Sequence, residues 1–546
     1  MEHINQGKKV EDMKKGLSLL LASTLTLSLA LTACGGTEQA ATPGKAGESP
    51  GTTAANEKIA LKMVKRGYTD VHPPAKDLWM WKKYEEKTGI RVDFEEIPAA
   101  AVTERKNVIL GSNDLPDAFY RIAFGTDELM KYGKQGLFIP LEKLIEQHAP
   151  NLNKLLRDNP DIKRAITMSD GHIYALPYVD FSKAFNSVRL YINKSWLDEA
   201  GLAVPKTTAE FRSALKTVRQ KDPARLGWVL ESRYWTFLES FLASSFGMGE
   251  GGSKAFGQSI YKDKDGQIKT TFNDPKYKEL LQYMSDLYKD GSLAQQNFTT
   301  GYDYAKWSTD GANNLVGSFV WEGPGYIGKD AAKNYVGINA LEGPRGDKVA
   351  GTLGPAAKGI FGFIITNKNK HPVETLKWID YFYGEEGILF GTFGIEGETY
   401  KMVDGKPKYI DDILNYKGGV QLGAFQYVDN VYGAYYPYVE PKDELRMAAR
   451  GTTVADEIKA DPAELDKFAP KELWPDFVPT DEEAKQTSAM LTDINKYIEE
   501  MRVKFVTGKA NLDTEWDNYV KTLDKMGAAK YLDIRRKQYE RYMSVK

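Results

Sequence analysis

The chain has 546 residues, and its 73 Lys and Arg residues nearly balance 75 Asp and Glu residues, which gives a formal net charge of −2. This balance argues against a nucleic-acid partner, because proteins that bind nucleic acid present a basic face. The sequence contains one cysteine, so the fold cannot depend on internal disulfides.

The N-terminus predicts a secretion signal. Four lysines among the first 15 residues precede an apolar run at 16–31. This run is shorter than the roughly 20 apolar residues that span a membrane, and it matches the apolar region of a signal peptide, about 7–15 residues long. The signal reads best from Met13, which leaves open whether the chain starts at Met1 or at Met13.

The sole cysteine, Cys34, stands directly after Leu31-Thr32-Ala33 and before two glycines. This arrangement resembles the bacterial lipoprotein pattern, which implies that the Cys34 thiol is acylated and that residues 1–33 are removed as the signal peptide. The alternative is an ordinary cysteine behind a simple signal peptide. The position of the only cysteine, where the lipid must be attached, disfavours that alternative.

The segment after Cys34, up to Glu57, is rich in Gly, Ala, Thr, Ser, Pro and Glu and has no aromatic residue. Such a composition cannot bury a core, so we expect residues 34–57 to be a flexible tether. The tether would hold the folded body at the outer face of the cell membrane, with the bilayer as a partner through acylated Cys34.

The remaining body has about 490 residues, enough for two or more lobes of the usual size of about 100–200 residues each. Its first elements are a predicted strand at 58–64, a helix that ends at Gly89, and a strand at 90–94. This order predicts a β-α-β unit and a parallel sheet. Ligands of open α/β sheets bind beyond the carboxyl ends of such strands, so the loop that contains Tyr68 is a candidate wall of a site.

A series of motifs continues through the body with a characteristic order. It comprises Asp114–Tyr120, Gly136–Leu141, Asp170–Tyr178, Tyr191–Thr208, Trp378–Gly387, Gly394–Tyr400 and Phe505–Gly508 with Trp516. The series resembles the family 1 extracellular solute-binding proteins of bacterial ABC importers, in particular the long lipoprotein branch that serves oligosaccharide uptake in Gram-positive bacteria.

This resemblance implies an α/β, two-lobe periplasmic-binding-protein-like fold of type II, with discontinuous lobes and a ligand cleft between them. It places the N-terminal lobe at 58–180 plus about 358–400, and the C-terminal lobe at 181–357 plus about 401–546. It also implies an oligosaccharide ligand, permease subunits in the membrane as partners, a monomer, and no catalysis.

No metal or cofactor is expected. Many members of this branch have a calcium loop after the helix that follows a Trp-Leu motif, but this chain has the short segment Lys221–Gly227 there, without the alternating oxygen ligands of calcium. The segment Asp263–Gly266 partly imitates an EF-hand loop. Its glycine stands at the fourth position rather than the sixth, and we expect a β-hairpin turn instead.

Candidate sugar-binding residues fall in clusters that mix aromatic and polar side chains, a combination that suits sugar rings and their hydroxyl groups. Each cluster follows an apolar run, where the loops of an α/β fold begin. The candidates are Tyr178 at the first crossing between lobes, Arg233, Tyr234 and Trp235 in the second cluster, Trp321, Glu322 and Tyr326 in the third, and Tyr68. Each of these side chains could instead be a packed loop aromatic or a solvated charge.

Two functions of other classes stay open. A surface glycoside hydrolase would need two carboxylates about 5–5.5 Å or 6.5–9.5 Å apart, and the acidic pairs adjacent in the sequence do not suggest one. A surface protein that binds carbohydrate without transport is the other alternative. The sequence does not give the sugar, its linkage or its length.

Overall fold

The computed structural model describes residues 59–67, 73–230, 235–249, 259–298, 304–417, 419–429 and 437–545. The side chains of 235–237, 304–305 and 358–361 lie outside this description, as do the predicted signal peptide, Cys34 and the tether. Residues Lys58–Lys546 form one compact unit.

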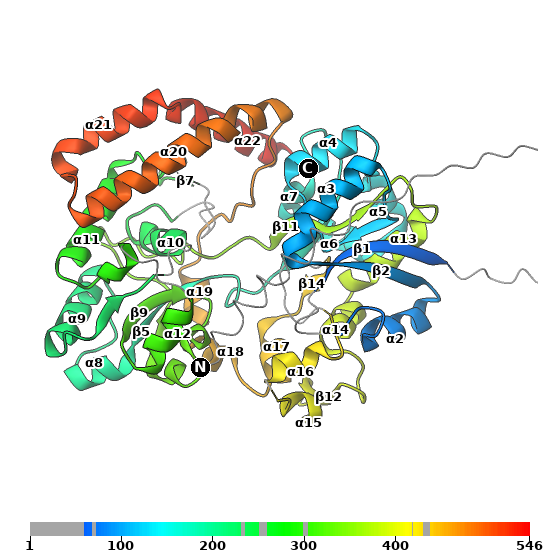
Figure 1. The fold of residues 1–546 in the computed structure, drawn as a ribbon, viewed down its shortest axis with the longest axis horizontal. Helices are drawn as coiled ribbons and strands as arrows, with labels where there is room; N and C mark the ends of the chain where they lie inside the picture. The colour runs from blue at the N-terminus through cyan, green and yellow to red at the C-terminus, as the bar shows by residue number, and fades with distance from the viewer. Residues whose placement is uncertain are drawn as a thin grey trace, which may run out of the picture. The chain divides into compact units, whose positions relative to one another are not determined.

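One lobe is built on a six-stranded mixed sheet, with the strand order β14-β4-β11-β3-β1-β2 (Figure 1). Strand β1 pairs in parallel with β2 and with β3, which confirms the predicted β-α-β unit. Strand β11 runs antiparallel between β3 and β4. The strands are β1 (Ala60–Gly67), β2 (Arg91–Pro98), β3 (Ala118–Tyr120), β4 (Leu176–Asp180), β11 (Ala357–Ile365) and β14 (Val439–Glu440).

The helices of this lobe come from two separate parts of the sequence, 79–166 and 372–449, which are blue to cyan and yellow-green to yellow in Figure 1. Helix α2 (Trp79–Thr88) ends at Gly89, whose φ of 70° makes it the predicted left-handed stop. The others are α3 (Val102–Ser112), α4 (Thr126–Lys134), α5 (Glu142–His148), α6 (Pro150–Asp158), α7 (Pro160–Ile166), α13 (Pro372–Asp380), α14 (Glu385–Phe393), α15 (Asp411–Leu414), α16 (Val420–Phe425) and α17 (Asp443–Ala449), with a hairpin of β12 (Tyr400–Val403) and β13 (Lys406–Tyr409).

The other lobe contains a four-stranded sheet with the order β10-β5-β9-β6. Its strands are β5 (Arg189–Asn193), β6 (Leu226–Trp228), β9 (Val316–Trp321) and β10 (Tyr335–Ile338). The helices are α8 (Lys194–Ala200), α9 (Thr208–Lys221), α10 (Trp235–Ser245), α11 (Pro275–Lys289), α12 (Tyr304–Ala312), α18 (Val454–Ile458) and α19 (Ala463–Lys467). Helix α9 begins with a capping box, because the Thr207 side chain accepts from the Glu210 backbone N–H and the Glu210 side chain accepts from that of Thr207.

The predicted turn at 263–266 is confirmed. It joins the antiparallel strands β7 (Ile260–Lys262) and β8 (Ile268–Thr270). Asp263 Oδ1 accepts hydrogen bonds from the backbone N–H groups of Asp265 and Gln267, at 3.0 and 2.8 Å, and Gly266 has a φ of 78°. The carboxylate therefore closes a turn within the hairpin.

Two large hydrophobic clusters correspond to the two sheets. The first includes residues from Leu61 to Val179 and from Ala357 to Val439, and the second includes residues from Val188 to Leu341 and from Trp474 to Tyr542. The segment 401–439 thus packs with the first sheet, whereas the sequence analysis assigned everything after about residue 401 to the other lobe.

A smaller hydrophobic cluster joins the segments that cross between the lobes. Its buried members are Ala184, Ala350, Met447, Val454, Ile458 and Leu465. Ala184 belongs to the first crossing segment, which connects β4 to β5, and Ala350 to the second, which connects β10 to β11. The rest belong to the third crossing segment, which leaves β14. We call this set the crossing cluster.

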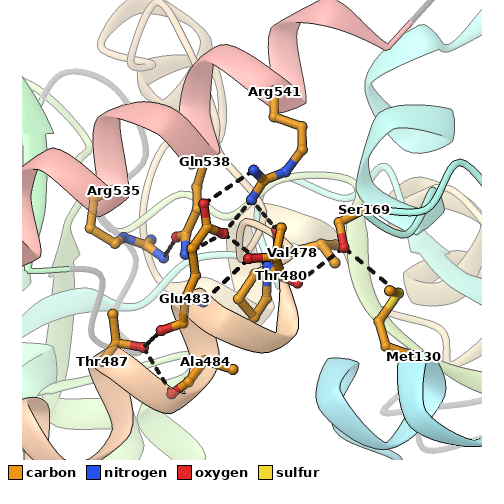
Figure 2. A network of polar contacts seen from close by, with 11 residues as sticks. Met130, Ser169, Val478, Thr480, Glu483, Ala484, Thr487, Arg535, Gln538 and Arg541 are labelled. Atoms are coloured by element: carbon orange, nitrogen blue, oxygen red, sulfur yellow. Dashed lines mark hydrogen bonds and ion pairs between the residues drawn. The ribbon is translucent and has the colours of Figure 1, made fainter.

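The chain ends in helices α20 (Asp481–Thr507), α21 (Leu512–Lys525) and α22 (Ala528–Ser544). Helix α20 starts at a capping box of Thr480 and Glu483, and its apolar stripe packs in the second cluster. Figure 2 shows Arg541 of α22 reaching Glu483 and the Val478 carbonyl, while the Ser169 hydroxyl donates to the Pro479 carbonyl at 3.3 Å. In the described ranges, no helix has both the length and the apolar character needed to cross a bilayer.

Candidate functional site: an aromatic edge of the second sheet

Strands β6 and β9 end at the same edge of the second sheet. They are parallel, with Trp228 opposite Ser318, so the residues that follow each strand leave on the same side. The antiparallel neighbour β5 begins there, with Arg189 opposite Trp321. Residues 181–188, which precede β5, form the connection from the first sheet. This edge, where Trp321 ends β9, therefore adjoins a crossing between the lobes.

Trp321 and Tyr326 form a stacked pair at this edge. Their ring centroids are 4.1 Å apart and the ring planes differ by 24°. The buried Trp307 of α12 meets both rings edge-on, at 5.9 Å from Trp321 and 5.5 Å from Tyr326. Trp321 and Tyr326 are both partly exposed. Trp321 and Tyr326 of the third predicted cluster thus form one aromatic platform, which the buried Trp307 ring supports.

Glu322 is exposed beside this platform. Its backbone carbonyl accepts a hydrogen bond from the Tyr191 hydroxyl at 3.2 Å and another from Arg189 Nη1. The main chain of Glu322 is therefore fixed from inside the sheet, while the residue is exposed at the surface.

Tyr178 is only 4% exposed, and its hydroxyl donates to Glu440 Oε2 at 2.8 Å. The Tyr438 hydroxyl donates to the same oxygen, and Arg446 Nε lies 3.0 Å from Glu440 Oε1. Burial, followed by the charge of Glu440, raises the pKa of the Tyr178 hydroxyl well above its ordinary value. Tyr178 thus belongs to a buried polar network, a setting unlike the open platform formed by the third cluster.

Of the three candidates in the second predicted cluster, the structure describes only the backbone of Trp235. Trp235 is the first residue of α10, which follows β6, and its side chain lies outside the described residues. Arg233, Tyr234 and Tyr68 also lie outside them.

The sequence analysis missed a buried ion pair in the first lobe. Lys65 Nζ of β1 contacts Asp429 Oδ2, and Trp81 Nε1 donates to the same oxygen at 3.1 Å. The ammonium lies 5.7 Å from the Trp81 ring and 5.4 Å from the Phe94 ring. A lysine within the apolar pattern of β1 was the available signal. Its partner stands 364 residues away, so no spacing rule could have found the pair.

Arg121 is a second missed feature. It follows β3 directly, is buried, and has a φ of 58°, in the left-handed region that residues with a Cβ rarely adopt. Its backbone N–H donates to the Gly362 carbonyl at 2.8 Å. Such backbone strain persists only where the surroundings enforce it, and it is concentrated at functional sites.

Asp443 connects the first and third crossing segments. Its Oδ2 accepts a hydrogen bond from the Ala184 backbone N–H at 3.3 Å. Burial raises the pKa of the Asp443 carboxyl, the Arg446 charge opposes this shift and the Asp180 charge adds to it, and together they bring the pKa to about 6. This carboxylate therefore titrates in a range where ordinary surface aspartates stay ionised.

Comparison with known proteins identifies the family. Residues 67–388 match the family of bacterial extracellular solute-binding proteins. The chain belongs to this family. It is 28% identical to the fructooligosaccharide ABC transporter substrate-binding protein FusA of Streptococcus pneumoniae, over 96% of this chain and 98% of FusA.

Solved structures of other solute-binding proteins share the fold. The structure of S. pneumoniae FusA in complex with kestose has a TM-score of 0.66 and 24% identity, over 89% of this chain and 100% of FusA. A solute-binding protein from Bifidobacterium longum infantis, described as binding HMO, has a TM-score of 0.71 and 20% identity, over 89% and 99% of the two chains. The two sheets described above are thus the two lobes of a solute-binding protein fold.

Arg225 forms the main polar contacts of the segment Lys221–Gly227, in which the sequence analysis expected no calcium loop. Arg225 forms ion pairs with Glu199 and Asp222, and its guanidinium lies 4.7 Å from the Trp196 ring centroid. Within the described ranges, no group of three His, Cys, Asp or Glu side chains is arranged to hold a metal ion. The cation that these carboxylates contact is part of the chain itself.

Proposed function

We propose that this solute-binding protein captures an oligosaccharide outside the cell and delivers it to the permease of an ABC importer. The main support is the stacked and partly exposed pair of Trp321 and Tyr326. The exposed Glu322 follows Trp321 directly in the sequence. FusA, which matches this chain along nearly its whole length, is named as a fructooligosaccharide-binding protein of an ABC transporter.

The chemistry of the platform suits a sugar. Aromatic side chains offer a large apolar face with little conformational freedom to lose, and a sugar ring presents a matching apolar face. A carboxylate at the rim can accept hydrogen bonds from sugar hydroxyl groups, and such charge-assisted bonds are stronger than neutral ones. Trp235, Tyr234, Arg233 and Tyr68 remain candidates for further contacts, on the evidence of their sequence positions alone.

Lobe closure would trap the ligand. The crossing cluster ties the segments that connect the two sheets, as expected of a hinge between two packed bodies. A sugar that contacts both lobes would stabilise the closed arrangement, which the permease would then recognise. In this proposal the protein acts as a monomer and breaks no bond.

The anchoring part of the proposal rests on the sequence. The segment at 16–33, followed by Cys34 and the tether, supports a lipid attached to the Cys34 thiol at the outer face of the membrane. Replacing Cys34 with serine should release the full-length protein from the membrane fraction into the medium. If the C34S protein stays with the membrane, another segment anchors it.

The binding experiment uses the protein from Lys58 onward, which contains the compact unit. Thermal unfolding is measured with kestose, longer fructooligosaccharides and a panel of other neutral oligosaccharides. A ligand that binds only the folded state raises the midpoint by mass action. Each sugar is then recovered and analysed by chromatography. A raised midpoint with intact sugar supports the proposal, cleaved sugar indicates a hydrolase, and a panel without effect rejects an oligosaccharide ligand of these classes.

A further inference from the structure

We infer that Arg189 is a positioning residue that couples the aromatic site to the crossing segments, so that Glu322 and the hinge move as one unit. This inference rests on the proposed function in taking the Trp321 edge as the ligand site. The contacts themselves do not depend on which solute binds there.

Arg189 is the first residue of β5 and is 0% exposed. Its Nη1 donates to the Glu322 carbonyl and to the Tyr191 hydroxyl, the latter at 3.1 Å. Its Nη2 donates to the Ala184 carbonyl and to the Ser187 hydroxyl, the latter at 3.0 Å. One planar guanidinium thus holds the loop after β9 with one nitrogen and the connection from the first lobe with the other.

The same guanidinium reaches the third crossing segment through its neighbours. Its Nε donates to Asn339 Oδ1 at 3.2 Å, and Asn339 Nδ2 donates to the Asp461 carbonyl at 2.8 Å. The Tyr191 hydroxyl lies 3.0 Å from the Ile458 carbonyl. Arg189 therefore connects the loop after β9 with the first crossing segment directly, and with the third crossing segment through Asn339 and Tyr191.

The electrostatics of this position are unusual for a structural arginine. A buried charge is normally paired with an opposite charge, because its transfer from water is unfavourable. Among the described residues, Arg189 contacts only neutral oxygens, namely two carbonyls, two hydroxyls and one amide. Five donors in a rigid fork suit this task, since each can fix a separate segment, which a lysine ammonium cannot do.

Coupling follows from these shared contacts. A displacement of the first crossing segment moves the acceptors on Ala184 and Ser187, and the guanidinium can keep these bonds only by shifting with them. The Glu322 carbonyl, bonded to the same group, is then pulled along or released. A ligand held on Trp321 and Tyr326 would bias the hinge through this path, and the hinge would bias the loop in return.

Hydrogen exchange of amide protons tests this coupling without any ligand. The variant Arg189→Lys keeps the charge but cannot bond to both segments. We expect exchange at 321–328 and at 182–187 to accelerate together, on the order of tenfold. The matched control is Arg219→Lys, because Arg219 also donates to backbone carbonyls in this lobe, those of Arg225 and Gly291. That control should accelerate exchange near its own contacts only.

A second variant tests whether a general loss of stability, rather than the loss of these contacts, explains faster exchange. Tyr191→Phe keeps the ring in the core and removes the hydroxyl between Arg189, Glu322 and Ile458. It should accelerate exchange of the same two segments to a smaller extent. If either variant accelerates only one of the two segments, or accelerates all segments equally, the coupling is wrong.

Kestose provides the functional readout. If kestose binds the wild type, Arg189→Lys should weaken binding about tenfold, whereas Arg219→Lys should not. Unchanged binding by a folded Arg189→Lys protein would overturn the inference. Failure of the wild type to bind any sugar would reject the proposed ligand class, while the exchange measurements would still decide the coupling.

Discussion

At the scale of single residues, Trp321 is the side chain on which the sugar-binding proposal depends most. Truncation of a central aromatic anchor commonly weakens binding by about 2 kcal/mol or more. We therefore expect Trp321→Ala to raise the Kd of whichever panel sugar binds by at least about tenfold, as measured by titration calorimetry.

Two controls separate binding from folding in that experiment. Trp474→Phe alters a tryptophan that is 1% exposed in the second hydrophobic cluster, so it should lower the unfolding midpoint and leave the Kd unchanged. Tyr178→Phe removes a hydroxyl that is bonded to Glu440 and should also leave the Kd unchanged. A large effect of Tyr178→Phe on affinity would instead return Tyr178 to the binding site.

Asp443 predicts a pH dependence of stability. Burial raises its folded-state pKa to about 6, from an ordinary value of 3.8. The folded state therefore binds more protons than the unfolded state between these two values, and stability falls as the pH rises from about 4 to about 6. Above pH 6 the ionised carboxylate reduces stability by an amount on the order of 2–3 kcal/mol.

The variant Asp443→Asn removes this titration while keeping an acceptor for the Ala184 N–H. The difference in unfolding free energy between variant and wild type should favour the variant at pH 7 and diminish toward pH 4, as measured by urea unfolding at a series of pH values. A difference that stays constant across the series would contradict the assignment.

The sequence predicted the group around Trp321 but missed the pair of Lys65 and Asp429. Trp321, Glu322 and Tyr326 could be predicted to lie near one another because they fall within six residues at the end of an apolar strand. Their role in ligand binding stays a prediction. The contact of Lys65 with Asp429 joins positions 364 residues apart, and only the fold brings them together. The sequence analysis placed Tyr178 at the first crossing between lobes, whereas Tyr178 lies within β4, and the sequence could not show that its hydroxyl would bond to Glu440.

At the scale of elements, the contacts of Arg225 in the segment that follows α9 lead us to expect that calcium does not change the stability of the protein. Arg225 occupies the space between Glu199 and Asp222 with its own positive charge. We expect the unfolding midpoint to be the same with 1 mM calcium as with excess EDTA, about 1 mM being a level at which extracellular calcium modules are occupied. Arg225→Ala should lower the midpoint, because it leaves these carboxylates and the Trp196 face without their cation.

A shift of the wild-type midpoint with calcium would reveal a site elsewhere in the chain. Repeating the measurement with Asp263→Asn would show whether the β7–β8 turn is that site, since its carboxylate already accepts two backbone N–H groups. A calcium-dependent rise seen only in Arg225→Ala would show that the arginine replaces a metal ion at this place.

Element boundaries followed from local signals where these existed. The helix end at Gly89 depends on residues within one helical turn, so the sequence alone placed it. The capping boxes at Thr207 and at Thr480 are equally local signals. Strand β14 has two residues and no periodicity to detect. Its pairing with β4 keeps the chain in the first lobe past residue 401, a consequence of long-range pairing that spacing does not reveal.

At the scale of the whole molecule, the C-terminal helices contact both lobes. Helix α20 packs in the second hydrophobic cluster, while Asp481 at its start lies 2.7 Å from Lys134 of α4. Near the end of α22, the Tyr542 ring lies 5.6 Å from the Arg164 guanidinium of α7. The segment 478–480 between these contacts is held by Arg541 and Ser169 (Figure 2). These contacts should make the unfolding of the two lobes cooperative.

Arg541 is the residue to change, because it donates to the Val478 carbonyl at 3.0 Å and forms an ion pair with Glu483 at the first turn of α20. Hydrogen bonds that involve a charged group contribute about 1.5–3 kcal/mol, so Arg541→Ala should lose a similar free energy of unfolding. The exposed pair of Lys134 and Asp481 should contribute at most about 1 kcal/mol, which makes Lys134→Ala the matched control.

If the C-terminal helices link the lobes, urea unfolding of Arg541→Ala should become less steep and should differ between helical circular dichroism and tryptophan fluorescence. If both probes instead shift together with unchanged steepness, Arg541 is not needed for the coupling of the two lobes.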